Sequence, residues 1–273
     1  MMTRTNQPTM AEYFGWKAHP FSDTCQFPAP FIGERDQRIV DQALSLLQYG
    51  KSYAITGASG VGKSTLVQHL LSLLDTNYYR NIFIHYGGLQ RNGVLRAVAD
   101  KLGVEMRGRM PMLVTLQKQI ASLITGANPV HPVIVVDDAQ LLERQSLLDL
   151  CSLTVCPPTK KAAASLILVG DESLKKQMDL DVMTPIRTRM TVHFRMEPLD
   201  EKDAGEFISF RLRHAKTPPD LFERDAMPVV AAKCRGNRRR IMNTGTLLIE
   251  EAYYRQVKTI NSELILACDL FNT

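Results

Sequence analysis

The chain has 273 residues, 45% hydrophobic and 22% charged, the composition of a globular protein large enough to bury a core. No apolar run approaches the ~20 residues of a bilayer span, and the first residues lack the apolar stretch of a secretory signal. We therefore expect a cytoplasmic protein without a membrane span.

The 5 cysteines lack the paired spacing of a zinc site, and their odd number argues against a disulfide framework. The formal net charge of +5 and basic clusters such as KCRGNRRR at 233–240 permit an anionic partner, although such clusters also occur as solvated surface.

Residues 1–30 are rich in proline and aromatic residues, and we predict that they form an irregular arm. Short apolar segments then alternate with helical patterns. Strands are predicted at 52–56, 81–86, 132–137, 165–170 and 192–196. Helices are predicted between them at 63–74, 93–102, 112–123 and 139–153. Because parallel strands need crossover connections, this alternation predicts an α/β fold with a five-stranded parallel sheet flanked by helices.

The pattern changes after residue 199, where only helical periodicity remains. It covers 200–215, 224–233, 238–255 and 261–268, with the PPD at 218–220 as a break. The sequence thus predicts three parts: an N-terminal arm (1–30), an α/β domain (31–199) and a small all-helical domain (200–273).

The segment GASGVGKST, residues 57–65, has the spacing G-x-x-x-x-G-K-[ST] and lies between a predicted strand and a predicted helix. Backbone N–H groups and the helix N-terminus of such a loop bind phosphates, so the motif predicts ATP as the ligand. Lys63 would reach the β and γ phosphates, and the Ser64 hydroxyl would ligate Mg²⁺. The alternative is a glycine-rich turn without a ligand. The predicted nucleotide-binding residues of the loop are Gly57, Ala58, Ser59, Gly60, Val61, Gly62, Lys63, Ser64 and Thr65.

Two adjacent acids end the buried strand in VIVVDDAQLL, residues 133–142. A nucleotide fold needs an acid at the carboxyl end of a strand beside the phosphate loop, so we predict that Asp137 holds Mg²⁺. Asp138 would then polarise the water that attacks ATP. The alternative is that the two acids cap the next helix, an interpretation that suits Asp138 better than Asp137.

Several further segments occur in the order found in AAA+ ATPases, and they most resemble the branch that contains the secretion ATPase ExeA and the transposition regulators TnsC, TniB, IstB and MuB. YFGWKAHPFS resembles the opening of ExeA-like proteins, and FIGERDQRI resembles the box that contacts adenine, here through Ile32 and Gly33. VVDDAQLL resembles their Walker B segment, and LILVGDESL resembles the end of a later strand. Residues 189–215 resemble the passage into the helical lid, and RGNRRRIMN resembles the start of a lid helix.

The resemblance implies roles for residues far from the phosphate loop. Arg189 takes the place of the arginine finger, which reaches the γ-phosphate bound by a neighbouring subunit, with Arg187 as the alternative. Arg239 takes the place of the sensor-2 arginine, and Asp171 lies closest to the sensor-1 position. Since the finger acts on a neighbouring subunit, the resemblance implies a homo-oligomer, either a ring or a helical filament.

The sequence departs from the resembled ATPases at three positions. Asp138 replaces the usual Glu, Arg238 replaces a Pro, and Met242 replaces an Asn. The missing methylene shortens the reach of Asp138 by ~1.5 Å. We therefore expect hydrolysis of ATP to ADP and phosphate that is slow or depends on a partner.

Two functions fit the resemblance. The first is an ATP-dependent regulator of DNA transposition that oligomerises on double-stranded DNA without sequence specificity and recruits a transposase, together with a target-selection protein. The second is a soluble ExeA-like ATPase that assists assembly of a secretion or pilus system. We expect the first, because the larger secretion members carry a transmembrane helix and a periplasmic module that this sequence lacks.

Basic residues that follow the second strand are the predicted DNA contacts. In ring-forming relatives this segment lines the pore, where phosphate contacts bind without reading sequence. The alternative is a solvated helix face. The predicted residues are Arg91, Arg96, Lys101, Arg107, Arg109 and Lys118.

Overall fold

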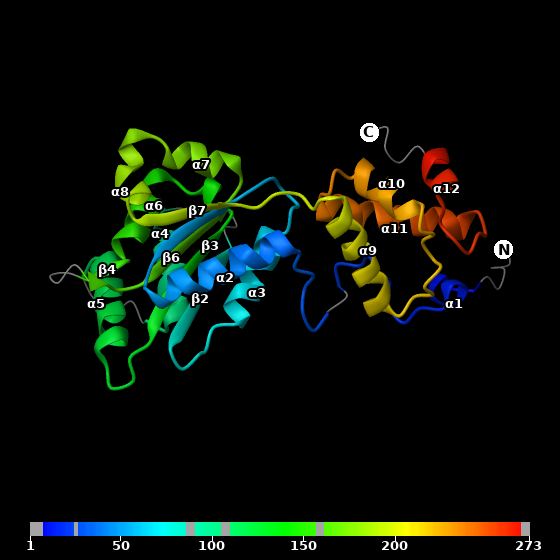
Figure 1. The fold of residues 1–273 in the computed structure, drawn as a ribbon. Helices are drawn as coiled ribbons and strands as arrows, with labels where there is room; N and C mark the ends of the chain where they lie inside the picture. The colour runs from blue at the N-terminus through cyan, green and yellow to red at the C-terminus, as the bar shows by residue number, and fades with distance from the viewer. Residues whose placement is uncertain (1–7, 25–26, 86–90, 105–109, 157–160, 269–273) are drawn as a thin grey trace, which may run out of the picture. The chain divides into compact units, whose positions relative to one another are not determined.

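One parallel sheet organises residues 52–195 of the protein (Figure 1). The computed structural model describes residues 8–24, 27–85, 91–104, 110–156 and 161–268. Within these ranges five strands pair in the order β2-β3-β6-β1-β7, each neighbouring pair parallel. The strands are β1 Ser52–Thr56, β2 Tyr79–His85, β3 His131–Asp137, β6 Ser165–Gly170 and β7 Met190–Arg195. The predicted fold class is confirmed.

The central strands are buried on both faces, which explains their unbroken apolar sequences. Every residue of β1 and β6 is buried, as are the last six residues of β3. A sheet covered by helices on both sides has no solvated face, so its strands lose the alternation of polar and apolar residues.

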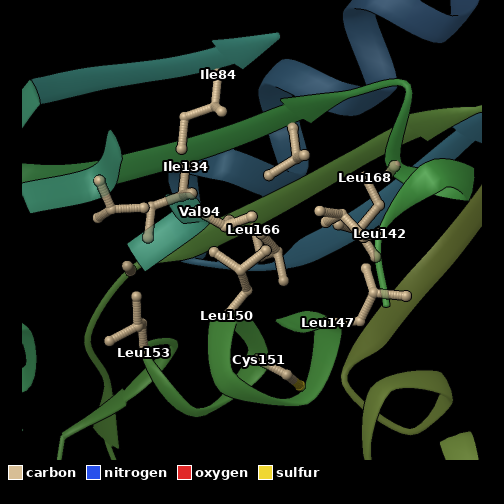
Figure 2. Packing of buried hydrophobic residues seen from close by; sticks show 14 of the residues in the cluster. Ile84, Val94, Ile134, Leu142, Leu147, Leu150, Cys151, Leu153, Leu166 and Leu168 are labelled. Atoms are coloured by element: carbon tan, nitrogen blue, oxygen red, sulfur yellow. The ribbon is translucent and has the colours of Figure 1, made fainter. Parts of the chain in front are cut away.

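Helices from the middle of the chain cover one face of the sheet. Side chains of α6 belong to the cluster on this face, and Figure 2 shows Leu150 below Leu166 of β6 and Leu147 near Leu142. All of these residues belong to one hydrophobic cluster, to which the other helices on this side also contribute. The helices are α4 Arg91–Leu102, α5 Met112–Thr125, α6 Arg144–Ser152, α7 Glu172–Met178 and α8 Thr184–Arg187.

Two earlier helices, α2 Glu34–Gln48 and α3 Lys63–Ser72, lie over the other face (Figure 1). Val40, Ala43 and Leu47 bury one side of α2 at helical spacing. Sequence analysis assigned no helix here, although this spacing is present in the sequence. Two short elements complete the described α/β part: the antiparallel pair β4 Val155–Cys156 with β5 Lys161–Ala162, and the 3₁₀ turn η2 Asp181–Met183.

The predicted helix at 139–153 is wrong over its first turn. A 3₁₀ turn, η1 Ala139–Leu141, precedes α6, and the chain between them is extended at Leu142 and Glu143. The break lets Leu142 enter the core while its carbonyl oxygen accepts a hydrogen bond from the side chain of Gln177, at 3.1 Å. Helical periodicity continues across the break, and for that reason the sequence did not reveal it.

The described residues divide into two compact units. One holds the sheet and its helices over Arg35–Ser59 and Lys63–Met196, and the other combines Gly60–Gly62 with the described parts of the two ends of the chain. This second unit has its own hydrophobic core and five helices among its described residues. They are α1 Met10–Phe14, α9 Glu201–Ala215, α10 Ala226–Lys233, α11 Arg238–Tyr254 and α12 Ser262–Ala267. No helix in the described ranges is long and apolar enough to cross a membrane.

The N-terminal segment is part of the helical unit's core. Phe14, Trp16 and Phe21 are buried among its helices. The guanidinium of Arg211, on α9, donates to the carbonyl oxygens of Pro20 and Ser22, each at 2.7 Å. Arg211 is only 8% exposed, so these two hydrogen bonds help to offset the cost of burying its charge. The segment is therefore part of the packed structure of the helical unit.

Candidate nucleotide site

The phosphate loop connects the end of β1 to the first residue of α3. Gly60 and Gly62 have φ angles of 82° and 101°, in the region that glycine adopts without steric cost. Lys63 is only 9% exposed, and its Nζ donates to the carbonyl oxygens of Gly57 at 2.9 Å and Ala58 at 3.0 Å. Its ammonium group is thus folded back over the loop, where a bound phosphate would meet it.

A histidine that sequence analysis did not identify braces the start of the loop. Thr56, the last residue of β1, is fully buried, and its Oγ1 lies 2.6 Å from Nε2 of His193 on β7. Burial, with a smaller effect from Lys175, lowers the pKa of His193. No local motif signals this contact, because it depends on the pairing of β1 with β7.

Asp137 is a buried acid at the end of β3. It is 3% exposed, and its Oδ1 accepts a hydrogen bond from the backbone N–H of Asp138 at 3.1 Å. Its Oδ2 lies 3.5 Å from Nδ1 of His85, its register partner on β2. A carboxylate buried at a strand end costs stability unless it is paired or binds a cation. His85 is a second functional candidate that the sequence did not reveal.

Asp138 turns the chain out of the strand. It adopts a left-handed conformation with φ of 54° and precedes η1 without capping it through its side chain. The carboxylate instead accepts a hydrogen bond on Oδ1 from Nε2 of Gln140, at 3.1 Å. Its Oδ2 lies 3.9 Å from Nε2 of His85. The alternative role of helix cap is therefore not what the Asp138 side chain does.

Asp171 follows β6 and begins α7. Its Oδ1 accepts hydrogen bonds from the backbone N–H of Ser173 at 2.8 Å and from the Ser173 hydroxyl. Burial raises the pKa of Asp171, but the hydrogen bonds from Ser173, with smaller effects from the Leu174 backbone and the charge of Lys63, together hold this pKa below its ordinary value. The carboxylate thus caps a helix, and a sensor-1 role for it stays a prediction.

The residues around the loop fit a magnesium–nucleotide complex. Mg²⁺ prefers oxygen ligands, and the buried Asp137 carboxylate at the end of β3 offers them. The Ser64 hydroxyl on α3 is the second candidate ligand. Bound Mg²⁺ would neutralise charge on the phosphates, and Lys63 already has an ammonium group oriented over the loop. The donor set therefore matches the predicted cofactor.

The candidate arginine fingers lie on the surface at the end of α8. Nη1 of Arg189 donates to the carbonyl oxygen of Pro185 at 2.9 Å, and Nη1 of Arg187 donates to that of Asp179 at 3.0 Å. Both side chains are exposed. The choice between them stays a prediction.

The remaining predicted nucleotide residues belong to the helical unit, which also includes Gly60–Gly62. Inside this unit the backbone N–H of Arg239 donates to the carbonyl oxygen of Gly60 at 3.1 Å, and the Arg238 guanidinium donates to that of Val61. Arg238, where the resembled ATPases have proline, thus contacts the phosphate loop. Ile32 and Gly33 also belong to the helical unit and come just before α2 in the chain. That they contact adenine stays a prediction.

The predicted DNA contacts are only partly described. Arg91 begins α4, and Arg96 and Lys101 are exposed on the same helix. Lys118 is exposed on α5. Arg107 and Arg109 lie outside the described residues. The three exposed side chains are available to a partner, and their role stays a prediction.

Comparison with known families identifies the class of the α/β part. Residues 47–178 match the AAA domain family. This range contains the whole phosphate loop and both acids of β3. The match and the site together indicate that this part of the chain resembles an AAA-type P-loop ATPase domain, a class of domain that uses ATP and Mg²⁺. Comparison with curated protein sequences gave no match.

Solved structures with the same fold include nucleotide- and DNA-associated proteins. The ORC1 protein of Aeropyrum pernix in complex with DNA is 17% identical, with a TM-score of 0.65 over 87% of this chain and 65% of that one. The ORC2 protein of Aeropyrum pernix in ADPNP–ADP complexes is 13% identical, with a TM-score of 0.67 over 92% and 71%. The RuvB Holliday junction branch migration motor of Thermotoga maritima is 18% identical, with a TM-score of 0.57 over 86% and 68%. The chain spans just under two thirds of the ORC1 protein's length, and these likenesses establish the fold.

Proposed function

We propose that the protein is an ATP-dependent regulator of DNA transposition that oligomerises on double-stranded DNA without sequence specificity and recruits a transposase to the target. The observation that carries the nucleotide part is the phosphate loop after β1 together with Asp137 and Asp138 at the end of β3. Both segments leave the carboxyl edge of one parallel sheet. ATP binding would build the assembly, and hydrolysis would take it apart.

Four residues perform the chemistry in this proposal. Lys63 binds the β and γ phosphates, and Ser64 and Asp137 hold Mg²⁺. Asp138 accepts a proton from the attacking water. The position of the Lys63 ammonium group over the phosphate loop and the buried carboxylate of Asp137 at the end of β3 support this assignment.

The proposed oligomer rests on the role proposed for Arg189 as the arginine finger. An arginine that completes the site of a neighbouring subunit must lie on the surface, and Arg189 does. Arg239 would contact the nucleotide as the sensor-2 residue, and Ile32 and Gly33 would contact adenine. A ring or helical filament is the assembly proposed.

Binding to DNA rests on charge and on fold. The sequence pI is about 8.9, and Arg96, Lys101 and Lys118 are exposed beyond the second strand. Lys and Arg that contact phosphates bind any duplex sequence, with an affinity that falls steeply with salt. The Aeropyrum pernix ORC1 protein, which has the same fold, is in complex with DNA. Because such contacts do not read sequence, a separate target-selection protein would choose the DNA target, and the transposase would be a further partner.

The second candidate is a soluble ExeA-like ATPase that assists assembly of a secretion or pilus system. The opening YFGWKAHPFS favours it, because this segment resembles ExeA-like proteins and supplies Phe14, Trp16 and Phe21 to the helical core. A measurement of DNA binding distinguishes the two candidate functions, because only the transposition regulator is proposed to assemble on DNA.

The test is electron microscopy of the purified protein with a non-hydrolysable ATP analogue, with and without duplex DNA. Rings or filaments that form on DNA with the analogue are expected, and Lys63→Ala should form none. Lys51→Ala, which changes an exposed lysine just before β1, is the matched control and should assemble normally. Absence of DNA binding at low salt would overturn the DNA part and favour the secretion candidate.

A companion measurement tests the predicted contacts. The triple charge reversal of Arg96, Lys101 and Lys118 to Glu should weaken duplex binding by at least tenfold at ~0.1 M salt and flatten its salt dependence. Arg144→Glu, at an exposed residue of α6 outside the predicted set, is the control. Equal affinity of the triple variant and the control would place the DNA surface elsewhere.

A further inference from the structure

Gln140 connects the two candidate catalytic segments through its side-chain amide. Its Nε2 donates to Oδ1 of Asp138 at 3.1 Å. Its Oε1 accepts a hydrogen bond from the backbone N–H of Asp171 at 3.3 Å. Asp138 follows β3 and Asp171 follows β6, which are neighbouring strands of the sheet. One amide thus spans the ends of two strands.

The chemistry of the amide fixes its orientation. A backbone N–H can only donate, so the atom that faces Asp171 must be the oxygen, and the NH₂ group then faces Asp138. A glutamate at this position could accept from Asp171 but would repel the carboxylate of Asp138. A single planar amide therefore satisfies two partners of opposite hydrogen-bonding character.

The surroundings leave room for this side chain and limit its movement. A Cβ added to Gly170 would lie 2.7 Å from Oε1 of Gln140, so the glycine permits the close approach. The left-handed backbone of Asp138 and the 3₁₀ turn that follows bring positions 138 and 140 together. The predicted continuous helix would instead have pointed these two side chains in different directions.

We propose that Gln140 is a positioning residue for ATP hydrolysis, which holds the Asp138 carboxylate in place and ties it to the end of β6. The proposal rests on the proposed role of Asp138 as the group that activates water. A base must stay within hydrogen-bond distance of the water that it activates. A short acid next to a left-handed turn needs an external contact to keep one rotamer, and the Gln140 amide provides it.

The test compares steady-state ATP turnover of Gln140→Glu and Gln140→Met with the wild type. Glu keeps the acceptor for Asp171 and places a negative charge against Asp138, whereas Met keeps the length and removes both hydrogen bonds. We expect kcat to fall at least tenfold in the Glu variant and less in the Met variant, with the KM for ATP changed by less than about threefold. The Met variant also keeps the test valid if the Glu variant fails to fold.

Gln145→Glu is the matched control. The Gln145 amide donates to Oδ1 of Asp149 at 3.1 Å on α6, outside the site. The change places a carboxylate against a carboxylate, as Gln140→Glu does, and should leave kcat unaltered. A loss of kcat in the control equal to that in Gln140→Glu would overturn the proposal, because the effect would then be structural.

A double-variant cycle separates this proposal from the role of Asp138. In an Asp138→Asn background, Gln140→Glu should cause little further loss of kcat, because the group that it positions is gone. The same fractional loss in both backgrounds would overturn the positioning role alone. Full turnover by Asp138→Asn would overturn the proposed role of Asp138 and the positioning role with it. None of these outcomes depends on whether the protein binds DNA.

Discussion

His85 and Asp137 are register partners on β2 and β3, with Nδ1 of His85 3.5 Å from Oδ2 of Asp137. The histidine is exposed and the aspartate is buried, so the contact places an exposed imidazole beside a buried carboxylate. A Mg²⁺ ion bound by Asp137 would therefore have His85 as its neighbour. Strand pairing alone builds this arrangement.

Asp138→Glu tests whether reach limits hydrolysis. The extra methylene lengthens the side chain by ~1.5 Å, and we expect faster turnover if the acid is too short. The left-handed φ of 54° suits aspartate better than glutamate, so we also expect the free energy of unfolding to fall by roughly 1 kcal/mol. Turnover and chemical denaturation measure the two effects. A rate no higher than that of the wild type would remove side-chain reach as the explanation.

Arg189→Ala tests the finger in trans. Alone, the variant should bind ATP normally and lose at least a hundredfold in turnover, because a finger stabilises charge only in the transition state. Mixed with Asp138→Asn, which keeps Lys63 and therefore the ATP-dependent assembly, it should regain part of the activity, since the Asn variant supplies the finger and Arg189→Ala supplies the acid. Turnover of the separate and mixed variants is the measurement. If Arg187→Ala lowered ATP turnover and Arg189→Ala did not, the arginine finger would be Arg187 instead.

Replacing two helical glycines by alanine should have opposite effects on the free energy of unfolding. A Cβ at Gly245, on α11, would lie 2.6 Å from the ring of the buried Phe21, so Gly245→Ala should lower the free energy of unfolding by about 1–3 kcal/mol. A Cβ at Gly205, on α9, meets nothing within 4 Å. Gly205→Ala should therefore raise stability by about 0.5–1 kcal/mol through helix propensity. Chemical denaturation of both variants is the measurement, and a neutral Gly245→Ala would contradict the packing of the N-terminal segment.

Acid should destabilise the sheet unit through His131. Burial lowers the pKa of His131 below its ordinary value of 6.5, so the unfolded chain takes up the proton first. Stability is therefore complete above about pH 6.5 and falls as the pH drops toward the lowered pKa. His131→Gln keeps a polar partner for Ser165, whose Oγ lies 2.9 Å from Nε2 of His131, but cannot titrate. We expect a smaller drop in Tm between pH 7.5 and 5.5 in this variant, and an equal drop would contradict the assignment.

The sequence predicted those parts of the protein that depend on neighbouring residues. β1 and β6 have the predicted bounds, because each is a fully buried apolar run. The phosphate loop begins and ends where its motif does, because glycine spacing and the start of α3 are local properties. The acids of β3 were equally visible, since an apolar strand that ends in carboxylates is unusual.

The sequence did not predict contacts that depend on strand register or on a single turn. His193 reaches Thr56 only because β7 pairs with β1, and His85 reaches Asp137 only because β2 pairs with β3. Gln140 reaches Asp138 because one left-handed residue replaces the first turn of a predicted helix. Hydrophobic periodicity carries no information on such a turn, because the apolar positions suit both geometries.

The packing of Phe14, Trp16 and Phe21 into the helical core has a consequence for any shortened version of this protein. A fragment that starts at α2 would keep the whole AAA match but uncover the aromatic cluster around Phe222 and leave Arg211 without the carbonyl oxygens that it binds. Such a fragment is expected to aggregate through the newly exposed apolar surface. Expression trials and truncation series should therefore keep the chain from Met10 onward.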